Sequence, residues 1–134
     1  MKMVALKGRV FPANLNHAGT VFGGWLMGKM DQAASIAIED IVISPSVTVA
    51  VSHMSFLRPV YNGAIFTIYT EIKRIGNSAI DVDVDVQIKC NETHEAYSVT
   101  QALFTFVVVN ENGKPRNVRE VIRDDVDPYI TALL

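Results

Sequence analysis

Residues 21–40 constrain the fold more than any other part of the sequence, because their apolar side chains surround a helical axis on most sides. These apolar residues are Phe22, Trp25, Leu26, Met27, Met30, Ala33, Ala34, Ile36, Ala37 and Ile38. A helix that is apolar nearly all round is stable only where the rest of the protein covers it. The sequence therefore predicts one long central helix, which follows a loop at 13–20 rich in turn and capping residues.

After this helix the apolar residues recur with a period of two, which is typical of β-strands. The pattern is clearest in 78–89, where valine and isoleucine face the core and a row of Asp81, Asp83 and Asp85 faces water. Further strands are predicted at 4–11, 46–59, 64–75 and 97–109. One helix and a meander of long strands predict an α+β domain in which an antiparallel sheet curls around the helix.

The length of 134 residues fits one domain with a single core. We expect that domain to span 1–118, with 119–134 as a C-terminal tail to which we assign no chemistry. Hydrophobic residues make up 49% of the chain, which is more apolar surface than a small monomer hides comfortably. The open edges of the predicted sheet also need cover, so we expect a homo-oligomer.

Charge and cysteine content exclude several classes of protein. The formal net charge is −2 and no run of Lys or Arg could follow a phosphate backbone, so nucleic acid is not an expected partner. No apolar stretch approaches the length of about 18–20 residues that spans a bilayer, so no membrane association is expected. Lys7 and Arg9 interrupt the apolar segment that a signal peptide needs, and the single Cys90 excludes an internal disulfide. Both observations indicate the cytoplasm, and the histidines show no metal-binding spacing.

The predicted helix carries a stripe of small residues interrupted by one acid. Gly24, Gly28, Asp31 and Ser35 are spaced so that they lie on one side of the helix. Each interior glycine costs a helix about 1 kcal/mol relative to alanine, so we expect a strand or a ligand to approach the backbone closely. Both interpretations of Gly28 are open at this point. An aspartate on an otherwise apolar helix is either paired with a distant cation, solvated in a cleft, or functional.

Gly23 and Gly24 stand where the helix is expected to begin. The first backbone N–H groups of a helix have no partner within it and lie at the positive end of its dipole. Such donors stabilise the negative charge that develops on a carbonyl oxygen under attack, as in the hydrolysis of a thioester. The same two glycines are also compatible with an ordinary turn into a helix.

Five segments of the sequence carry specific motifs: 16–25 (NHAGTVFGGW), 30–34 (MDQAA), 51–60 (VSHMSFLRPV), 76–78 and 102–107. Together they resemble the signature of hotdog-fold acyl-CoA thioesterases of the bacterial short, broad-specificity type, and the similarity covers roughly residues 4–118. The resemblance implies the hotdog fold, an antiparallel sheet wrapped around one central helix. It also implies that Asp31 is the catalytic carboxylate and that Asn16 assists it, with active sites formed between two subunits.

The resemblance further implies a dimer as the smallest functional unit, and relatives of this type often assemble into hexamers. One position departs from the family, since members usually have an acidic residue where this chain has Ser52. No cofactor is expected, because CoA is part of the substrate and of the product. The residues we expect to hold its phosphates are Arg58, Arg74, Asn77, Ser78 and Arg116.

The expected reaction is hydrolysis of acyl-CoA to a free fatty acid and CoA. Because a thiolate leaves readily, one carboxylate suffices, and Asp31 would act as general base or as nucleophile. Asn16 would assist, and the N–H of Gly24, with that of Gly23, would hold the oxyanion. Two alternatives remain: a hotdog dehydratase or hydratase, which would need a histidine such as His17 or His53, and a non-catalytic acyl-CoA sensor.

Overall fold

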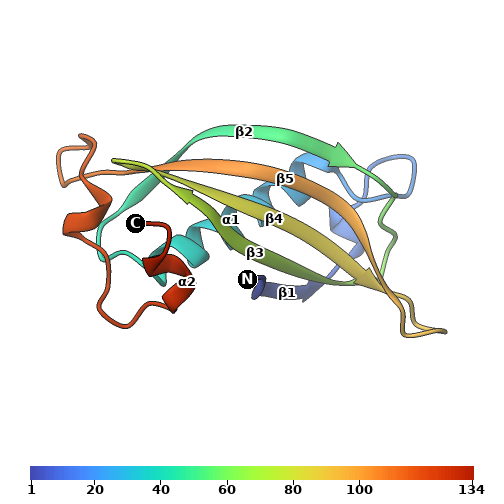
Figure 1. The fold of residues 1–134 in the computed structure, drawn as a ribbon. Coiled ribbons are helices and arrows are strands. Elements are labelled where there is room, and N and C mark those ends of the chain that lie inside the picture. Colours follow the sequence, from blue (N-terminus) through green and yellow to red (C-terminus); the bar gives the residue numbers. More distant parts are fainter.

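The computed structural model describes residues 1–134 (Figure 1). One long helix and five strands form the body of the protein, and two single-turn 3₁₀ helices and a short helix complete it. The elements are β1 (Met3–Arg9), η1 (Pro12–Asn14), α1 (Gly23–Glu39), β2 (Ser46–Phe56), β3 (Ile65–Ile75), β4 (Ala79–Lys89), β5 (Ala96–Val108), η2 (Val118–Glu120) and α2 (Pro128–Thr131). None of the helices is long and apolar enough to cross a membrane.

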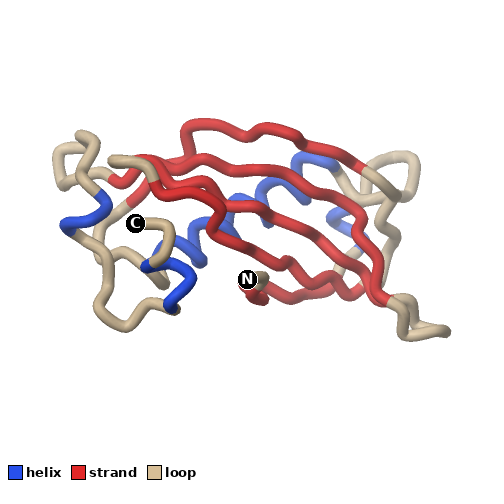
Figure 2. The backbone as a smooth tube through the Cα atoms, in the orientation of Figure 1, coloured by secondary structure: helices blue, strands red, loops and turns tan.

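The strands form one antiparallel sheet in the order β1-β3-β4-β5-β2. Figure 2 shows this sheet curving across α1, so that the molecule has a sheet layer and a helix layer. The inner residues of β4, such as Val82 and Val84, are fully buried together with Phe104 of β5. They meet Met30 and Ala33 of α1, which are also fully buried. The predicted α+β hotdog fold is confirmed.

Strand β2 lies at an edge of the sheet and pairs only with β5. Its apolar side chains are unusually exposed, with fractions of 48% for Val47 and 55% for Val49. The register against β5 shifts twice, and His53 beside the second shift has a backbone φ of 54°. A long apolar edge without lysine or proline invites pairing with another strand.

The polar face of β4 is less exposed than its sequence pattern predicts. Asp81 and Asp83 are half-buried, and Asp85 is only 3% exposed, so the row does not simply face water. Lys2 and Gln87 donate to Asp85 Oδ2 over 3.3 Å and 2.8 Å. Burial is the largest influence and raises the pKa of Asp85, but these hydrogen bonds and the Lys2 charge outweigh it and leave the pKa below its usual value.

Residues 119–134, which we call the C-terminal segment, fold back onto the end of α1. Val121 and Ile130 are each 1% exposed and belong to the hydrophobic core. The backbone N–H of Arg123 donates to the carbonyl of Ile41 over 2.8 Å. Figure 1 shows this segment, in orange and red, beside the cyan C-terminal end of α1.

Candidate active site

Asp31 is held by a hydrogen bond from the edge strand. Thr48 of β2 donates its hydroxyl to Asp31 Oδ1 over 2.5 Å, and the Asp31 side chain is half-buried. Thr48 faces the helix because it pairs with Phe106, whose side chain points into the core. Lysine or arginine forms no ion pair with Asp31, so the interpretation of this residue as a structural salt bridge is wrong within one chain.

The glycine stripe of α1 is open to the outside. An added Cβ at Gly24 or Gly28 would meet nothing within 4 Å, and both glycines are exposed. The interpretation of Gly28 as packed beneath the sheet is therefore wrong. Because nothing in the chain needs the missing side chains, the space above the stripe is available to another molecule.

The helix begins at Gly23, as required for the expected oxyanion site. Its N-cap, Phe22, offers no side-chain acceptor to the first turn, so the N–H groups of Gly23 and Gly24 have no partner within the helix. Gly24 and Asp31 are seven residues apart, which is about 10 Å along the helical axis. A water molecule, a thioester carbonyl and the hydrogen bonds at each end fill a span of this size.

Asn16 does not contact Asp31 in the same chain. Its side-chain oxygen accepts hydrogen bonds from the N–H groups of Ala18 and Thr20, over 2.9 Å and 3.2 Å. Its Nδ2 donates to the Thr20 hydroxyl over 3.2 Å. Asn16 thus shapes the loop before α1, two helical turns away from the carboxylate.

The five residues expected to hold CoA lie at opposite ends of the molecule. Arg58 follows β2 and stacks over Tyr97, with its guanidinium carbon 4.7 Å from the ring centre. The other four gather at the β3–β4 hairpin near the start of β2, where backbone hydrogen bonds join Asn77 to Val118, and both Ser78 and Arg116 to Val108. Arg74 sits 3.8 Å from Asp81. One chain does not bring all five together.

A polar cleft of about 360 Å³ lies between the C-terminal part of α1 and the start of β2, and neither Asp31 nor Thr48 lines it. We call it the serine cleft, and its lining residues are Ser35, Glu39, Val42, Ile43, Ser44, Pro45, Ser46 and Arg123. Ser35 follows Asp31 by one helical turn, and Ser46 precedes Thr48 by two residues on the same face of β2. The cleft therefore begins one helical turn beyond Asp31 and lies toward the C-terminal end of α1.

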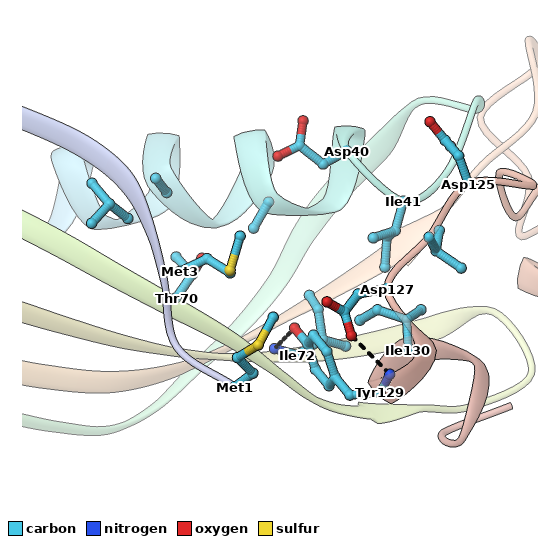
Figure 3. Close-up of a pocket in the computed structure, with 14 residues that line it drawn as sticks. Met1, Met3, Asp40, Ile41, Thr70, Ile72, Asp125, Asp127, Tyr129 and Ile130 are labelled. Atoms are coloured by element: carbon cyan, nitrogen blue, oxygen red, sulfur yellow. Dashed lines mark hydrogen bonds between the residues drawn. The ribbon is translucent and has the colours of Figure 1, made fainter.

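A separate apolar cavity of about 190 Å³ lies on the β1 side of α1 (Figure 3). Its walls come from β1, β3 and the C-terminal segment, and Asp31 is not among its lining residues. Figure 3 shows Tyr129, whose hydroxyl oxygen accepts a hydrogen bond from the Ile72 N–H over 3.3 Å. This cavity lies in the core next to α2, and neither Asp31 nor Thr48 lines it.

The structure identifies two residues that the sequence did not single out, Thr48 and Arg123. Thr48 belongs to a plain alternating strand, and only the register against β5 shows that it faces α1. Ser52, by contrast, pairs with Leu103, which pairs with Asp83 on the polar face of the sheet. Ser52 thus points away from the helix, and the acidic group that it lacks would not have faced Asp31.

The chemistry of the site rests on oxygen and backbone groups. No group of three or more His, Cys, Asp or Glu side chains could hold a metal ion. His17 and His53 are exposed, and neither is hydrogen-bonded to Asp31. What remains is a carboxylate fixed by a hydroxyl, free N–H groups at the start of the helix, and a polar cleft that begins one helical turn beyond the carboxylate.

Comparison with known proteins identifies the family of the chain. The family model described as the thioesterase superfamily matches residues 18–93, which is more than half of the chain. The acyl-CoA thioester hydrolase YciA of Escherichia coli strain K12 is 35% identical over 116 residues, which are 84% of this chain and 88% of that protein.

Solved structures agree with this family. A mutant of HI0827, described as a hexameric broad specificity acyl-coenzyme A thioesterase, has a TM-score of 0.87 and 33% identity over 98% of this chain and 94% of that one. An acyl-CoA hydrolase from Staphylococcus aureus, in complex with butyryl coenzyme A and coenzyme A, has a TM-score of 0.81 and 26% identity over 98% and 80%. Structures of its alanine mutants change an asparagine and an aspartate fifteen positions apart. The chain therefore belongs to the thioesterase superfamily, within its hotdog-fold acyl-CoA thioester hydrolases.

Proposed function

We propose that this protein hydrolyses acyl-CoA to a free fatty acid and CoA, with Asp31 as general base. The observation that carries the proposal is the Asp31–Thr48 pair at the open glycine stripe. Thr48 donates to Oδ1 and leaves Oδ2 free to take a proton from water. A fixed carboxylate beside empty space is suited to activating a water molecule that enters with the substrate.

The remaining steps follow from groups along the stripe. Water deprotonated by Asp31 attacks the thioester carbonyl, and the N–H of Gly24, aided by Gly23, receives the negative charge on its oxygen. The CoA thiolate then departs without a strong acid, because a thiol has a pKa of about 8.5. Direct attack by Asp31 would instead form a mixed anhydride, but Thr48 holds one of its oxygens and favours the role of base.

A second copy of the chain completes the site in this proposal. The free edge of β2 can pair with β2 of a copy around a two-fold axis, which makes the two strands antiparallel. The Phe56 end of one β2 then lies beside the Ser46 end of the other. Arg58 and Asn16 lie at the Phe56 end, since Arg58 shares a cleft with Thr20 at the start of α1.

This pairing brings together the residues that one chain separates. Asn16 of one copy approaches Asp31 of the other, and Arg58 joins the partner's cluster of Arg74, Asn77, Ser78 and Arg116 around the CoA phosphates. Asn16 and Asp31 are fifteen positions apart, as are the asparagine and aspartate mutated in the Staphylococcus enzyme. Relatives are described as hexameric, so we propose a dimer that assembles further into hexamers in the cytoplasm.

The decisive experiment measures thiol release from acyl-CoA esters from acetyl to palmitoyl. We expect turnover by the wild type and a loss of at least about 100-fold in kcat for Asp31→Asn, with acyl-CoA binding kept. Glu92→Gln is the matched control, because this exposed carboxylate lies in the turn between β4 and β5 and has no part in the proposed site. Binding without turnover of any ester would support a sensor instead, and turnover that survives Asp31→Asn would refute the assigned base.

A separate assay addresses the dehydratase alternative. Hydration of enoyl-CoA can be followed by the loss of its conjugated absorbance, with His17→Ala and His53→Ala in parallel. We expect no hydration by the wild type, because no histidine is hydrogen-bonded to Asp31. Hydration that depends on either histidine would replace the thioesterase assignment.

A further inference from the structure

We infer that Arg123, supplied by the C-terminal segment, binds a phosphate of the CoA part of the substrate through the serine cleft. The inference rests on the proposed function and extends its binding site. Arg123 is the only Lys or Arg among the residues that line the cleft. Through Arg123, the C-terminal segment takes part in substrate binding.

The cleft has the position that a CoA arm requires. Along α1 its lining begins at Ser35, one helical turn beyond Asp31, and extends to Glu39, four residues or about 6 Å further. The hydroxyls of Ser35 and Ser44 donate to backbone carbonyls and keep only their acceptor capacity, whereas Ser46 makes no side-chain hydrogen bond and can pair with an amide group of an extended pantetheine arm. An arm that lies in this cleft directs the phosphates toward the C-terminal end of α1, where Arg123 is.

The other end of the cleft adjoins the residues already expected to bind CoA. Ser46 pairs with Val108, and the N–H of Val108 donates to the carbonyl of Ser78 over 2.8 Å. The N–H of Arg116 donates to the carbonyl of Val108 over 2.8 Å. Arg123 therefore adds a cation to the same end of the molecule rather than forming a separate anion site.

The guanidinium of Arg123 is fixed in place but incompletely used. Its Nε donates to the carbonyl of Glu39 over 3.0 Å, which satisfies one free carbonyl at the end of α1. Neither Nη group has a hydrogen-bond partner, and no carboxylate lies within ion-pair distance. The hydrogen bond to the end of α1 therefore uses only Nε of the guanidinium. The half-buried fork of Nη donors that remains matches the geometry of phosphate oxygens.

The test compares hydrolysis of an acyl-CoA with hydrolysis of the same acyl group on pantetheine, which lacks the phosphates of CoA. We expect Arg123→Gln to raise KM for acyl-CoA about 10–100-fold with little change in kcat, because a charge-assisted hydrogen bond is lost. Arg123→Lys should recover part of this loss. KM for acyl-pantetheine should be the same for wild type and Arg123→Gln.

Two controls separate binding from folding. Arg9→Gln is matched, because Arg9 of β1 also donates to a backbone carbonyl, that of Gly63 over 2.8 Å, but does not line the cleft. If Arg123→Gln is poorly folded, the KM of Arg123→Lys for acyl-CoA tests the residue instead. The inhibition constants of free CoA and of pantetheine on the wild type then show how much the phosphates contribute to binding. An equal loss on both substrates would overturn the inference in favour of a structural role, and so would an unchanged KM. Wild-type protein that hydrolyses neither substrate would refute the proposed function itself.

Discussion

Thr48 and Asp31 join the edge strand β2 to the central helix through a single hydroxyl-to-carboxylate hydrogen bond. Replacing Thr48 by valine keeps the shape of the side chain but removes the donor. We expect kcat to fall about tenfold, because the carboxylate loses the hydrogen bond that orients it. Thr48→Ser keeps a donor and should restore most of the activity. Equal activity of Thr48→Val and the wild type would show that Thr48 does not position Asp31.

Gly28 tests whether the open stripe is used by another molecule. Nothing in the chain lies within 4 Å of a Cβ at Gly28, and alanine favours a helix over glycine by about 1 kcal/mol. If no other molecule contacted the stripe, Gly28→Ala would therefore leave the stability of the protein unchanged or raise it. We expect instead a loss of activity or of assembly, measured by thiol release and by analytical ultracentrifugation. An active, assembled and more stable variant would contradict contact at this stripe.

The free edge of β2 should be where two copies pair. Val49 is 55% exposed, and a lysine there would place a charge at the strand edge. We expect Val49→Lys to yield smaller particles in sedimentation and to lose activity in parallel. Val4→Lys is the control, since Val4 is 57% exposed on the opposite edge strand, β1. Loss of assembly in the control alone would move the interface to β1.

Tyr129 supports the end of β3 from the C-terminal segment. Its hydroxyl accepts the hydrogen bond of the Ile72 N–H, beyond the last residues of β3 that pair with β1. Tyr129→Phe leaves that N–H without this acceptor, so we expect the free energy of unfolding to drop by about 1–3 kcal/mol. Urea unfolding measures the change. Asp31 lies elsewhere, so the kcat of folded variant protein should equal that of the wild type.

Asp85 should make stability depend on acid pH. Its folded pKa is lowered, so its contribution is present above the unfolded pKa of about 3.9 and is lost as pH falls through the folded value. Asp85→Asn removes this contribution. We expect the stability difference between wild type and variant to be largest near pH 7 and to shrink below about pH 4. Urea unfolding across this range would contradict the idea if the difference stayed constant.

The periodicity of the sequence was sufficient to predict the architecture. The apolar residues of 21–40 predict the central helix but overstate its burial, because Phe22 and Met27 are exposed while Met30 is fully buried. The alternation in 78–89 places in the core the apolar residues that the structure buries, such as Val84. Asp85 is the exception, because its burial depends on Lys2 and Gln87, which neighbouring elements bring to it. A period of two assigns a face to a residue but does not determine what covers that face.

The candidate site was only partly predictable, and the reason is register. Asp31 and the glycines stand out within one helix, where spacing alone defines a stripe. Thr48 emerges only when its pairing with Phe106 of β5 is known. Arg123 lies in a segment without a periodic pattern, and its guanidinium reaches the cleft through contacts with Glu39 and Ile41. Long-range contacts of this kind leave no local pattern in a sequence.

The exposed edge of β2 also has a thermodynamic consequence. If its valines are covered only when two copies meet, assembly contributes to the free energy of the folded state, and mass action links that free energy to protein concentration. The melting temperature should then rise as the protein concentration increases and fall as the protein is diluted.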